Sequence, residues 1–552
     1  MPLDVLEPLR TAIGAAAERT TGARPAVVLN APAQPEHGDL ATPVAMGLAK
    51  QAKNPPREIA EAIAADLAAD ASLGPQLQSV EVAGPGFINI RLAPAWFAAV
   101  VRGILGESVE FGAEGAAAPE RILMEYVSAN PTGPLHVGHA RHAAYADSLA
   151  RLLAFSGHVV DREYYINDHG RQMEMLGISI ASRYGALFGV QTEIPEDGYR
   201  GDYVGGIAEA LCDEVGDRWV DELDPISDDA LAFFSGRGGE LMIDAIREEL
   251  IGVHVEFDAF FSEDSLHQNG RVAREVAALQ ERGDTYEDGG ALWFASSKYG
   301  DEKDRVLRRA DGDLTYLASD VAYHLDKARR GHDRLIDVLG ADHHGYIPRL
   351  RAILDSGGQS GEKLEVSLIQ LVSLVEQGEA KKMSKRAGTL VTMGDLVADI
   401  GVDATRFFLV QRSHETPLEL DLDLAREQSQ ENPVYYVQYA HTRALGILRQ
   451  LESEPPVDAP APAELDPAEK TLLMNLARWP EAVAEAAEKR GPHRVAAYLI
   501  DLARDFHAFY HRCRVAGEPQ DVQSFRVNLT RATAWTIRTG LGLLGVSAPE
   551  RM

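Results

Sequence analysis

Two histidines flank a glycine at the start of an apolar, alanine-rich run. In NPTGPLHVGHARHAAYADSLARLL, residues 130–153, these are His136, Gly138 and His139, and the run that follows is typical of a helix. Backbone N–H groups and the helix dipole favour an anion at such a helix start. Gly138 leaves space for a base or ribose, and the imidazoles can donate hydrogen bonds to phosphate oxygens in a transition state. The segment therefore favours a phosphate site.

A metal site is the main alternative interpretation of the two histidines. It needs a third ligand and usually a glutamate base, as in HExxH, and nothing of that shape lies nearby in the sequence. Cys212 and Cys513 have no CxxC spacing, which argues against a thiolate zinc site and a disulfide framework. The sequence also lacks GxGxxG after a strand and GxxxxGK[ST], which disfavours Rossmann dinucleotide and Walker-type sites.

A short basic segment farther along the chain is the second signal for phosphate. In GEAKKMSKRAGTL, residues 378–390, Lys382, Lys385 and Arg386 crowd a glycine-flanked stretch that is unsuited to a packed core. A solvated basic loop is the ordinary interpretation of such a run. Two independent phosphate-seeking segments in one domain favour a nucleotide site instead.

The domain that holds both segments alternates strand and helix patterns. The apolar runs RILMEYV (121–127), DRLIDVLGAD (333–342) and LEVSLIQLVSLV (364–375) are buried-strand candidates separated by helical stretches. This alternation predicts a parallel sheet wound by helices, which binds nucleotides at the carboxyl ends of its strands. The predicted fold class is α/β, with a Rossmann-like parallel-sheet domain over 120–425.

Two further domains are predicted to flank this one. Residues 1–110 combine a helix pattern with the strand-like alternation SVEVAGPGFINIRL, which predicts a small α/β domain. Residues 430–552 have helical periodicity almost throughout and predict an all-α helical bundle. GAEGAAAPE (112–120) is typical of a linker, and the Pro/Ala stretch 453–467 predicts an exposed connection after the first helix of the bundle. Three domains fit a chain of 552 residues.

Composition and charge limit the classes of function. An apolar fraction of 45% is ordinary for a globular protein, and no apolar run is long enough to span a bilayer. The start, MPLDVLEPLRTAIGAAAERT, has an acid-bearing amphipathic pattern rather than that of a signal peptide, so we expect a cytoplasmic protein without a membrane partner. A formal charge of −30 means that an RNA partner would need local basic patches.

The paired motifs HVGH and KMSK resemble the signatures of class I aminoacyl-tRNA synthetases. The wider context is similar to arginyl-tRNA synthetases, and this resemblance covers nearly the whole chain. It rests on residues 130–153 and on the stretches REYYINDHG, VAGPGFINI, VDATRFFLV, NPVYYVQYAHTR and LLGVSAPERM. The short motifs define the class, whereas the longer stretches define the specificity.

The resemblance implies a two-step reaction with Mg-ATP as a substrate and no protein-bound metal. The arginine carboxylate attacks the α-phosphate and expels pyrophosphate, and the arginyl group then passes to the 3′-terminal ribose of the cognate arginine tRNA. Such catalysis is positioning and charge stabilisation. The implied catalytic residues are His136, His139, Lys382 and Lys385, and the implied ATP-binding residues are these four with Gly138, Met383 and Ser384. Relatives commonly need bound tRNA before activation, and we expect the same here.

The implied arginine pocket agrees with the chemistry of the ligand. A guanidinium is planar, permanently charged and all donor, so its pocket must offer acceptors, preferably carboxylates. Tyr316 and Asp320 stand at i and i+4 in DLTYLASDVAYHLDKARR, would share one helix face, and match positions that the family uses to hold arginine. Glu263 in FDAFFSEDSL matches a family carboxylate for the guanidinium, with Asp264 as an alternative.

Two further segments would complete this pocket. Asn130 matches an asparagine that binds the α-amino end of the amino acid, and Ser128 is assigned to the same ligand. Where some relatives have paired glutamines after a glycine, this chain has GADHHGY. His343 is therefore a candidate arginine ligand, and whether it replaces a glutamine stays open.

The terminal domains would bind the tRNA. Residues 430–552 resemble the family's anticodon-binding domain, in which aromatic residues stack on splayed bases. The candidates are Tyr436, Tyr510 and Met552. Residues 1–110 resemble the family's added amino-terminal domain, which touches the tRNA elbow. The resemblance also implies a monomer.

Other functions compete with this interpretation. A nucleotidylyltransferase also uses a HxGH site, but such enzymes lack a large helical appendage. A catalytically silent tRNA-binding relative would be expected to lose the histidines or the lysine loop. Another class I specificity would need a thiol-seeking zinc site for cysteine or a cationic pocket for glutamate. The carboxylates leave lysine as the nearest competitor, since an ammonium could sit between two acids.

Overall fold

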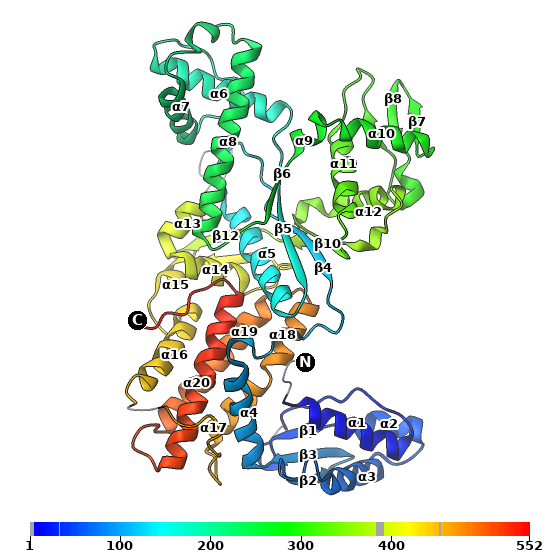
Figure 1. The fold of residues 1–552 in the computed structure, drawn as a ribbon, viewed down its shortest axis with the longest axis vertical. Helices are drawn as coiled ribbons and strands as arrows, with labels where there is room; N and C mark the ends of the chain where they lie inside the picture. The colour runs from blue at the N-terminus through cyan, green and yellow to red at the C-terminus, as the bar shows by residue number, and fades with distance from the viewer. Residues whose placement is uncertain (1–4, 33, 382–390, 452–453) are drawn as a thin grey trace.

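The protein is an elongated molecule with a central parallel sheet and further parts at both ends of it (Figure 1). The structure is a computed structural model, and it describes residues 5–32, 34–381, 391–451 and 454–552. The amino-terminal and helical carboxyl-terminal parts lie at one end of the molecule, and two lobes lie at the other (Figure 1). Within the described ranges, no helix is long and apolar enough to cross a membrane.

The amino-terminal part is a small α/β unit, as predicted. Its elements are α1 (Glu7–Thr21), β1 (Leu40–Thr42), α2 (Val44–Ala52), α3 (Pro56–Ala69), β2 (Leu77–Ala83), β3 (Phe87–Leu92) and α4 (Pro94–Glu107). The strands form an antiparallel sheet in the order β1-β3-β2, and the VEVAGPGFINI alternation becomes the β2–β3 hairpin. Gly86 has φ 139°, and a Cβ there would lie 2.9 Å from the Pro56 carbonyl oxygen, so this turn requires glycine.

The central sheet consists of five parallel strands in the order β11-β10-β4-β5-β6. The strands are β4 (Arg121–Glu125), β5 (Val159–Ile166), β6 (Ala259–Ser262), β10 (Arg334–Gly340) and β11 (Leu364–Ile369). The chain builds outward from β4 in both directions, first through β5 and β6 and later through β10 and β11. The strand order therefore reverses between β4 and β10, and such a reversal creates a crevice at the carboxyl ends of the strands.

Helices and two lobes fill the connections between these strands. The helix α5 (Val137–Phe155) follows β4, and its side chains are buried along almost its whole length. One lobe contains α6 (Arg171–Leu187), α7 (Asp202–Val215) and the long α8 (Asp228–Gly252). The other contains α9 (Glu263–Gln268), α10 (Arg271–Glu281), β7 (Thr285–Asp288), β8 (Ala291–Phe294), β9 (Arg305–Arg308), α11 (Tyr316–Arg329) and α12 (Ile347–Ser356).

The run LEVSLIQLVSLV forms two strands rather than one continuous strand. It divides at Gln370–Leu371 into β11 and β12 (Val372–Glu376), because β11 pairs with β10 whereas β12 pairs with β14 (Leu418–Asp421) and β13 (Glu379–Ala380). The chain therefore leaves the central sheet at this point, which periodicity along the sequence does not reveal. The helices α13 (Met393–Ile400), α14 (Val402–Val410) and α15 (Leu422–Arg426) surround the second sheet.

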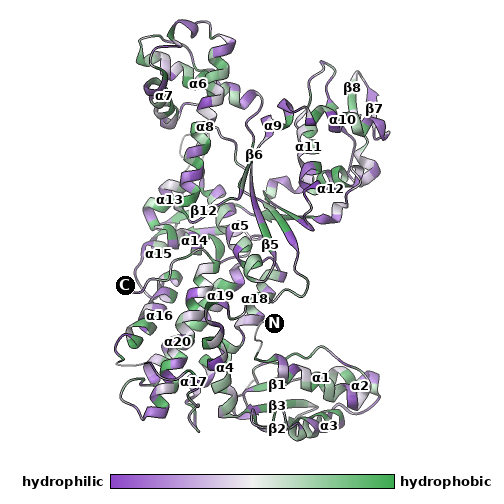
Figure 2. Ribbon diagram, in the orientation of Figure 1, coloured by the Kyte–Doolittle hydropathy of each residue, from purple (hydrophilic) through white to green (hydrophobic). Residues whose placement is uncertain are grey.

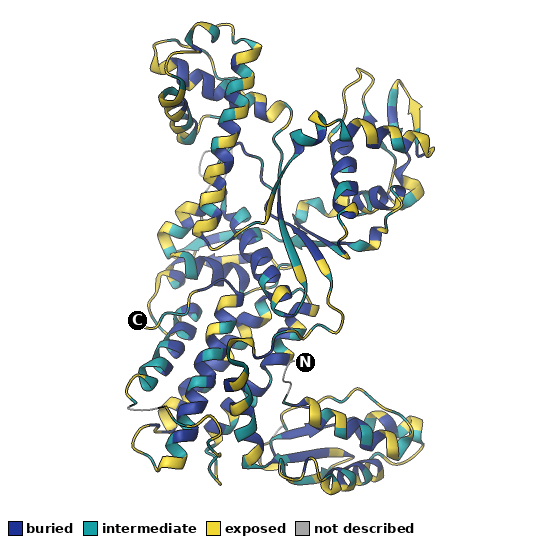
Figure 3. Ribbon diagram, in the orientation of Figure 1, coloured by how far each residue is buried: buried dark blue, intermediate teal, exposed yellow. Residues whose placement is uncertain are grey.

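The carboxyl-terminal part is the predicted helical bundle. It contains α16 (Pro433–Leu448), α17 (Pro467–Ala477), α18 (Trp479–Glu488), α19 (His493–Arg512) and α20 (Gln520–Leu543), and the Pro/Ala stretch lies between α16 and α17 as predicted. The helices carry hydrophobic residues toward the middle of the bundle (Figure 2), where buried residues concentrate, whereas strand β7 is largely exposed (Figure 3). Trp479 is 1% exposed and donates to the Phe111 carbonyl at 2.8 Å, which joins the bundle to the linker region.

Candidate active site

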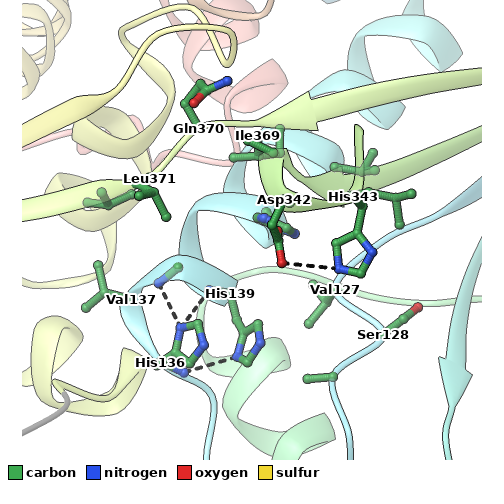
Figure 4. Close-up of a pocket in the computed structure, with 18 of the residues that line it drawn as sticks. Val127, Ser128, His136, Val137, His139, Asp342, His343, Ile369, Gln370 and Leu371 are labelled. Atoms are coloured by element: carbon green, nitrogen blue, oxygen red, sulfur yellow. Dashed lines mark hydrogen bonds and ion pairs between the residues drawn. The ribbon is translucent and has the colours of Figure 1, made fainter. Parts of the chain in front are cut away.

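A cavity of about 750 Å³ opens at the carboxyl ends of the central strands, where the strand order reverses between β4 and β10. Its lining includes the residues after β4, the start of α5, the end of β10 with the turn that follows, and the β11–β12 connection (Figure 4), and Tyr165, Asn167 and Val391 complete it. The predicted site residues that line it are Ser128, Asn130, His136, Gly138, His139 and His343. Folding thus brings three predicted segments around one cavity.

His136 and His139 cap the helix that they begin. The His136 Nδ1 accepts from the backbone N–H groups of Gly138 (3.1 Å) and His139 (3.4 Å), and the His139 Nδ1 accepts from the His136 N–H (3.3 Å). The rings stack with centroids 3.7 Å apart. Because each Nδ1 accepts a hydrogen bond, each neutral imidazole carries its proton on Nε2. The capping geometry therefore provides two Nε2–H donors at the cavity.

A side chain at position 138 would collide with the His136 ring. A Cβ at Gly138 would lie 2.8 Å from His136 Cε1 and 3.0 Å from its Nδ1. The His136 ring therefore occupies the space that the glycine leaves on this side of the helix. This space is therefore not available to a base or ribose alone, which differs from the prediction made from the sequence.

The segment after β4 has an unusual backbone. Val127 and Ser128 have φ values of 65° and 40°, in the left-handed region that β-branched valine rarely adopts. The Ser128 hydroxyl accepts from the Tyr165 N–H at 3.1 Å, and the Asn130 amide donates to Gln172 Oε1 at 2.7 Å. Neighbouring elements therefore hold both predicted side chains at the cavity.

The predicted carboxylates lie beside the cavity, around Tyr165 on its lining. Glu263 is 4% exposed, and burial with some repulsion from Asp320 raises its pKa. Burial also raises the pKa of Asp320 on α11. The pKa of Tyr165 is raised by burial and by the charges of Glu263, Asp320 and Glu125. Asp264, the alternative to Glu263, bonds His169 Nδ1 at 3.0 Å instead.

Tyr316 and His343 have different surroundings. Tyr316 begins α11, is 62% exposed and is not among the residues that line the cavity. His343 lies in the turn after β10 and lines the cavity, with its Nε2 3.6 Å from Asp342 Oδ2 (Figure 4). The helix predicted to carry Tyr316 and Asp320 is present, but Tyr316 is exposed whereas Asp320 is half-buried.

Three carboxylates that were not predicted from the sequence lie side by side on neighbouring strands of the central sheet. Asp337, Glu125 and Glu163 are in register on β10, β4 and β5. Lys327, which is fully buried, donates to Glu125 at 2.7 Å and to Asp337 at 2.5 Å. The Tyr323 hydroxyl lies 2.9 Å from the Glu125 carboxylate and 2.8 Å from that of Glu163. The network orients Glu125, which also lines the cavity.

The charges of this network can be assigned. Burial opposes ionisation of Asp337, but Lys327 and His324 outweigh it and hold the pKa of Asp337 at about 2. Burial likewise opposes protonation of Lys327, and the two carboxylates outweigh it and raise its pKa. Charged acids inside apolar strand candidates such as RILMEYV were the available signal, because a buried charge needs a partner.

His142, one turn after His139, also lines the cavity and was not singled out from the sequence. Burial, with His136 and Arg141 nearby, lowers its pKa to about 4, so this imidazole is neutral at physiological pH.

The predicted residues Lys382, Met383, Ser384 and Lys385 lie outside the described residues. The described residues that follow, from Val391 on, lie directly beside the histidines. The Val137 N–H donates to the Val391 carbonyl at 3.2 Å, and the Met393 N–H donates to the Leu135 carbonyl at 2.7 Å. Val391 lines the cavity.

The predicted tRNA-binding residues lie on the helical bundle and at its carboxyl terminus. Tyr436 on α16 packs against His507, with ring centroids 4.7 Å apart. Tyr510 on α19 is 39% exposed, and the Arg443 guanidinium lies 4.3 Å from its ring centroid. Met552 is 51% exposed. The three side chains do not form one contact cluster, but two of them belong to an aromatic and cationic surface on α16 and α19.

Three family models match successive parts of the chain. Residues 7–92 match the "Arginyl tRNA synthetase N terminal domain", residues 101–415 match "tRNA synthetases class I (R), catalytic domain", and residues 437–552 match "DALR anticodon binding domain". The central match covers more than half of the chain and contains all of the cavity-lining residues.

Curated relatives and a solved structure agree with these matches. The chain is 46% identical to the arginine–tRNA ligase of Shouchella clausii over 99% of this chain and 98% of that one. It is 45% identical to the arginine–tRNA ligase of Bacillus subtilis over 96% and 95%. The arginyl-tRNA synthetase structure from Thermus thermophilus superimposes with a TM-score of 0.75 over 99% of this chain and 100% of that chain, at 24% identity, which shows the shared fold.

Proposed function

The chain belongs to the arginyl-tRNA synthetase family and is an arginine–tRNA ligase, and from this premise we propose which of its residues perform each step. The family activates arginine with ATP and transfers it to tRNA. The residue assignments, the need for tRNA during activation and the roles of the domains are our proposals.

His136 and His139 stabilise the phosphates of ATP during activation. The support is their geometry, since both Nε2–H donors are set by helix capping at the positive end of α5. Donors that are already oriented need no reorganisation as charge develops, and each contributes roughly a hundredfold in rate. Gly138, Lys382, Met383, Ser384 and Lys385 complete the ATP site, with Lys382 and Lys385 acting on the leaving pyrophosphate.

Carboxylates around Tyr165 bind the arginine side chain. Glu263 and Asp320, with Glu125 from the buried network, offer the acceptors that a guanidinium requires. Ser128, Asn130 and His343 line the cavity nearer the histidines and contact the rest of the amino acid. Tyr316, on the exposed first turn of α11, reaches the substrate only after a side-chain movement.

The flanking domains bind the tRNA. Residues 1–110 contact its elbow, residues 120–425 perform the chemistry, and residues 430–552 bind the anticodon through Tyr436, Tyr510 and Met552. The support is the match of each part to a family domain and the exposed aromatic surface on α19. We also propose a monomeric, cytoplasmic enzyme that needs bound tRNA to activate arginine.

One observation carries the proposal: oriented imidazoles and buried carboxylates lie around one cavity at the carboxyl ends of the strands. The test is arginine-dependent ATP–pyrophosphate exchange with and without cognate tRNA, with lysine as the control amino acid. Exchange with arginine only when tRNA is present supports the whole proposal. Exchange with lysine would contradict the assignment of the pocket to arginine. Exchange without tRNA would contradict the tRNA requirement alone.

A matched pair of variants separates catalysis from capping. In His136→Asn and His139→Asn, an amide oxygen can still cap the helix, but the Nε2–H donor is lost. We expect each variant to lower kcat for exchange by roughly a hundredfold while thermal unfolding stays close to wild type. Full activity in both variants would remove the histidines from the mechanism.

A further inference from the structure

Arg141 is a buried arginine on α5 that donates hydrogen bonds to four main-chain carbonyls. It is 1% exposed and lies two residues after His139. Its Nη1 donates to the carbonyls of Gln370 (2.7 Å) and Leu371 (3.3 Å), and its Nη2 donates to those of Ser413 (2.9 Å) and Thr416 (2.9 Å). In the part of the chain that the structure describes, no carboxylate pairs with this guanidinium. The group therefore organises backbone rather than balancing a charge.

The four carbonyls belong to two connections that contact each other, and the first of them lines the cavity. Gln370 and Leu371 join β11 to β12 and line the cavity on the side opposite His136 and His139 (Figure 4). The second connection, residues 411–417, joins α14 to β14. The two are also bonded to each other, since the Gln370 N–H donates to the His414 carbonyl (2.9 Å). Arg141 thus links the helix of the histidines to the facing wall.

This wall has little packing of its own to hold it. The Leu371 side chain is 81% exposed, and the chain changes from one sheet to another at this point. A planar guanidinium with five donors can hold several acceptors in a set arrangement, whereas an ammonium on a flexible stem cannot. Leu371 gives the cavity an apolar surface, and apolar side chains are typical of the lining of ligand pockets.

We propose that Arg141 is a positioning residue for ATP, which holds the Gln370–Leu371 wall at a fixed distance from the two histidines. The inference rests on the proposed function, in which this cavity binds ATP. One helix then sets both the phosphate-contacting imidazoles and the wall that faces them. The distance between these two sides, where a nucleotide would bind, is then fixed.

The charge of Arg141 contributes a second, separable effect. Burial lowers the pKa of Arg141 to about 10, so the group stays protonated at neutral pH. A buried cation near the start of α5 also favours phosphate. Arg141→Lys keeps the charge and loses the fork of donors, whereas Arg141→Gln loses both.

The same helix supplies a matched control. Arg151 donates to Asp147 (2.7 Å) and to the His254 carbonyl (2.7 Å) and does not line the cavity. KM values for ATP and for arginine would be measured by pyrophosphate exchange with tRNA present. We expect Arg141→Lys to raise KM for ATP roughly tenfold and Arg141→Gln to raise it further, with KM for arginine within about twofold of wild type in both. Arg151→Lys should leave both values unchanged.

Other outcomes would overturn the inference. Wild-type behaviour of Arg141→Lys would assign the effect to charge alone, and an equal rise in both KM values would indicate a general structural role. If both Arg141 variants fail to fold, Leu371→Gly tests the wall itself, and an unchanged KM for ATP there would contradict the proposal. Absence of arginine-dependent exchange in the wild type would instead be a failure of the proposed function.

Discussion

The carboxylate of Glu249 accepts a hydrogen bond from the backbone N–H of Gly394 at 2.8 Å. Its other oxygen lies 3.4 Å from the Leu135 N–H, directly before the paired histidines. Glu249 stands near the end of α8, the long helix that runs from the α6–α7 lobe to the sheet domain (Figure 1). This one side chain therefore joins the lobe, the start of α5 and the segment after residue 391.

Glu249→Ala should impair activation more than it impairs folding. The change removes hydrogen bonds to an ionised group, each worth about 1.5–3 kcal/mol, and releases two segments at the active site. We expect kcat for pyrophosphate exchange to fall roughly tenfold or more. Glu248→Ala, at the exposed neighbouring position on α8, is the control and should be fully active. Equal activities of the two variants would contradict a role for the Glu249 contacts.

Gly138→Ala should inactivate the enzyme without unfolding it. Alanine favours a helix over glycine by about 1 kcal/mol, but its Cβ would meet the His136 ring and displace the imidazole. We expect exchange to fall roughly a hundredfold, as for loss of an oriented donor. Gly236→Ala on α8 is the control, because a Cβ there meets nothing within 4 Å, and it should raise the melting temperature while keeping activity.

Binding of arginine should weaken on the acid side at a higher pH than an ordinary carboxyl would cause. Burial raises the pKa of Glu263 above its usual 4.5, and the guanidinium requires the ionised form. Lowering the pH through the raised pKa therefore lowers kcat/KM for arginine. In Glu263→Gln, KM for arginine should rise roughly tenfold, since a charged hydrogen bond is lost. Asp320 is then the carboxyl whose titration should set the acid limb of the pH profile.

Protonation of Glu263 should favour folding, although it weakens arginine binding. A folded-state pKa above the unfolded value means that ionisation of Glu263 opposes folding, so its cost appears as pH rises from the unfolded pKa through the folded one. Glu263→Gln is therefore expected to unfold at a higher temperature than wild type at neutral pH, without ligands. The difference should disappear below the usual carboxyl pKa. A lower melting temperature at neutral pH would show that the charged form is stabilised by contacts.

Tyr510→Ala should weaken tRNA binding and spare the arginine site. Stacking of a base on an aromatic ring contributes about 1–3 kcal/mol, so KM for tRNA should rise roughly five- to a hundredfold in aminoacylation. Tyr286→Ala is the control, because Tyr286 is 44% exposed on the β7–β8 hairpin at the other end of the molecule (Figure 1). Similar KM values for the two variants would argue against a tRNA contact at Tyr510.

Local features of the site were predictable from the sequence. The helix after HVGH, the strand that ends at Glu125 and the helix that carries Asp320 depend on neighbouring residues and their periodicity. The division of LEVSLIQLVSLV at Gln370 was not predictable, because an apolar run looks the same whether its partner strand changes or not. Pairing partners are a property of the whole fold.

Sequence alone determined the family, the order of the domains and the two histidines at a helix start. Only the tertiary structure decided that Glu125 joins the acids near the cavity, since its orientation depends on Lys327, which is distant in sequence. It also decided that Arg141 faces carbonyls of two separate connections, a role that no local pattern marks. The physical reason is that a side chain's conformation and charge state follow from groups that meet only when the chain folds.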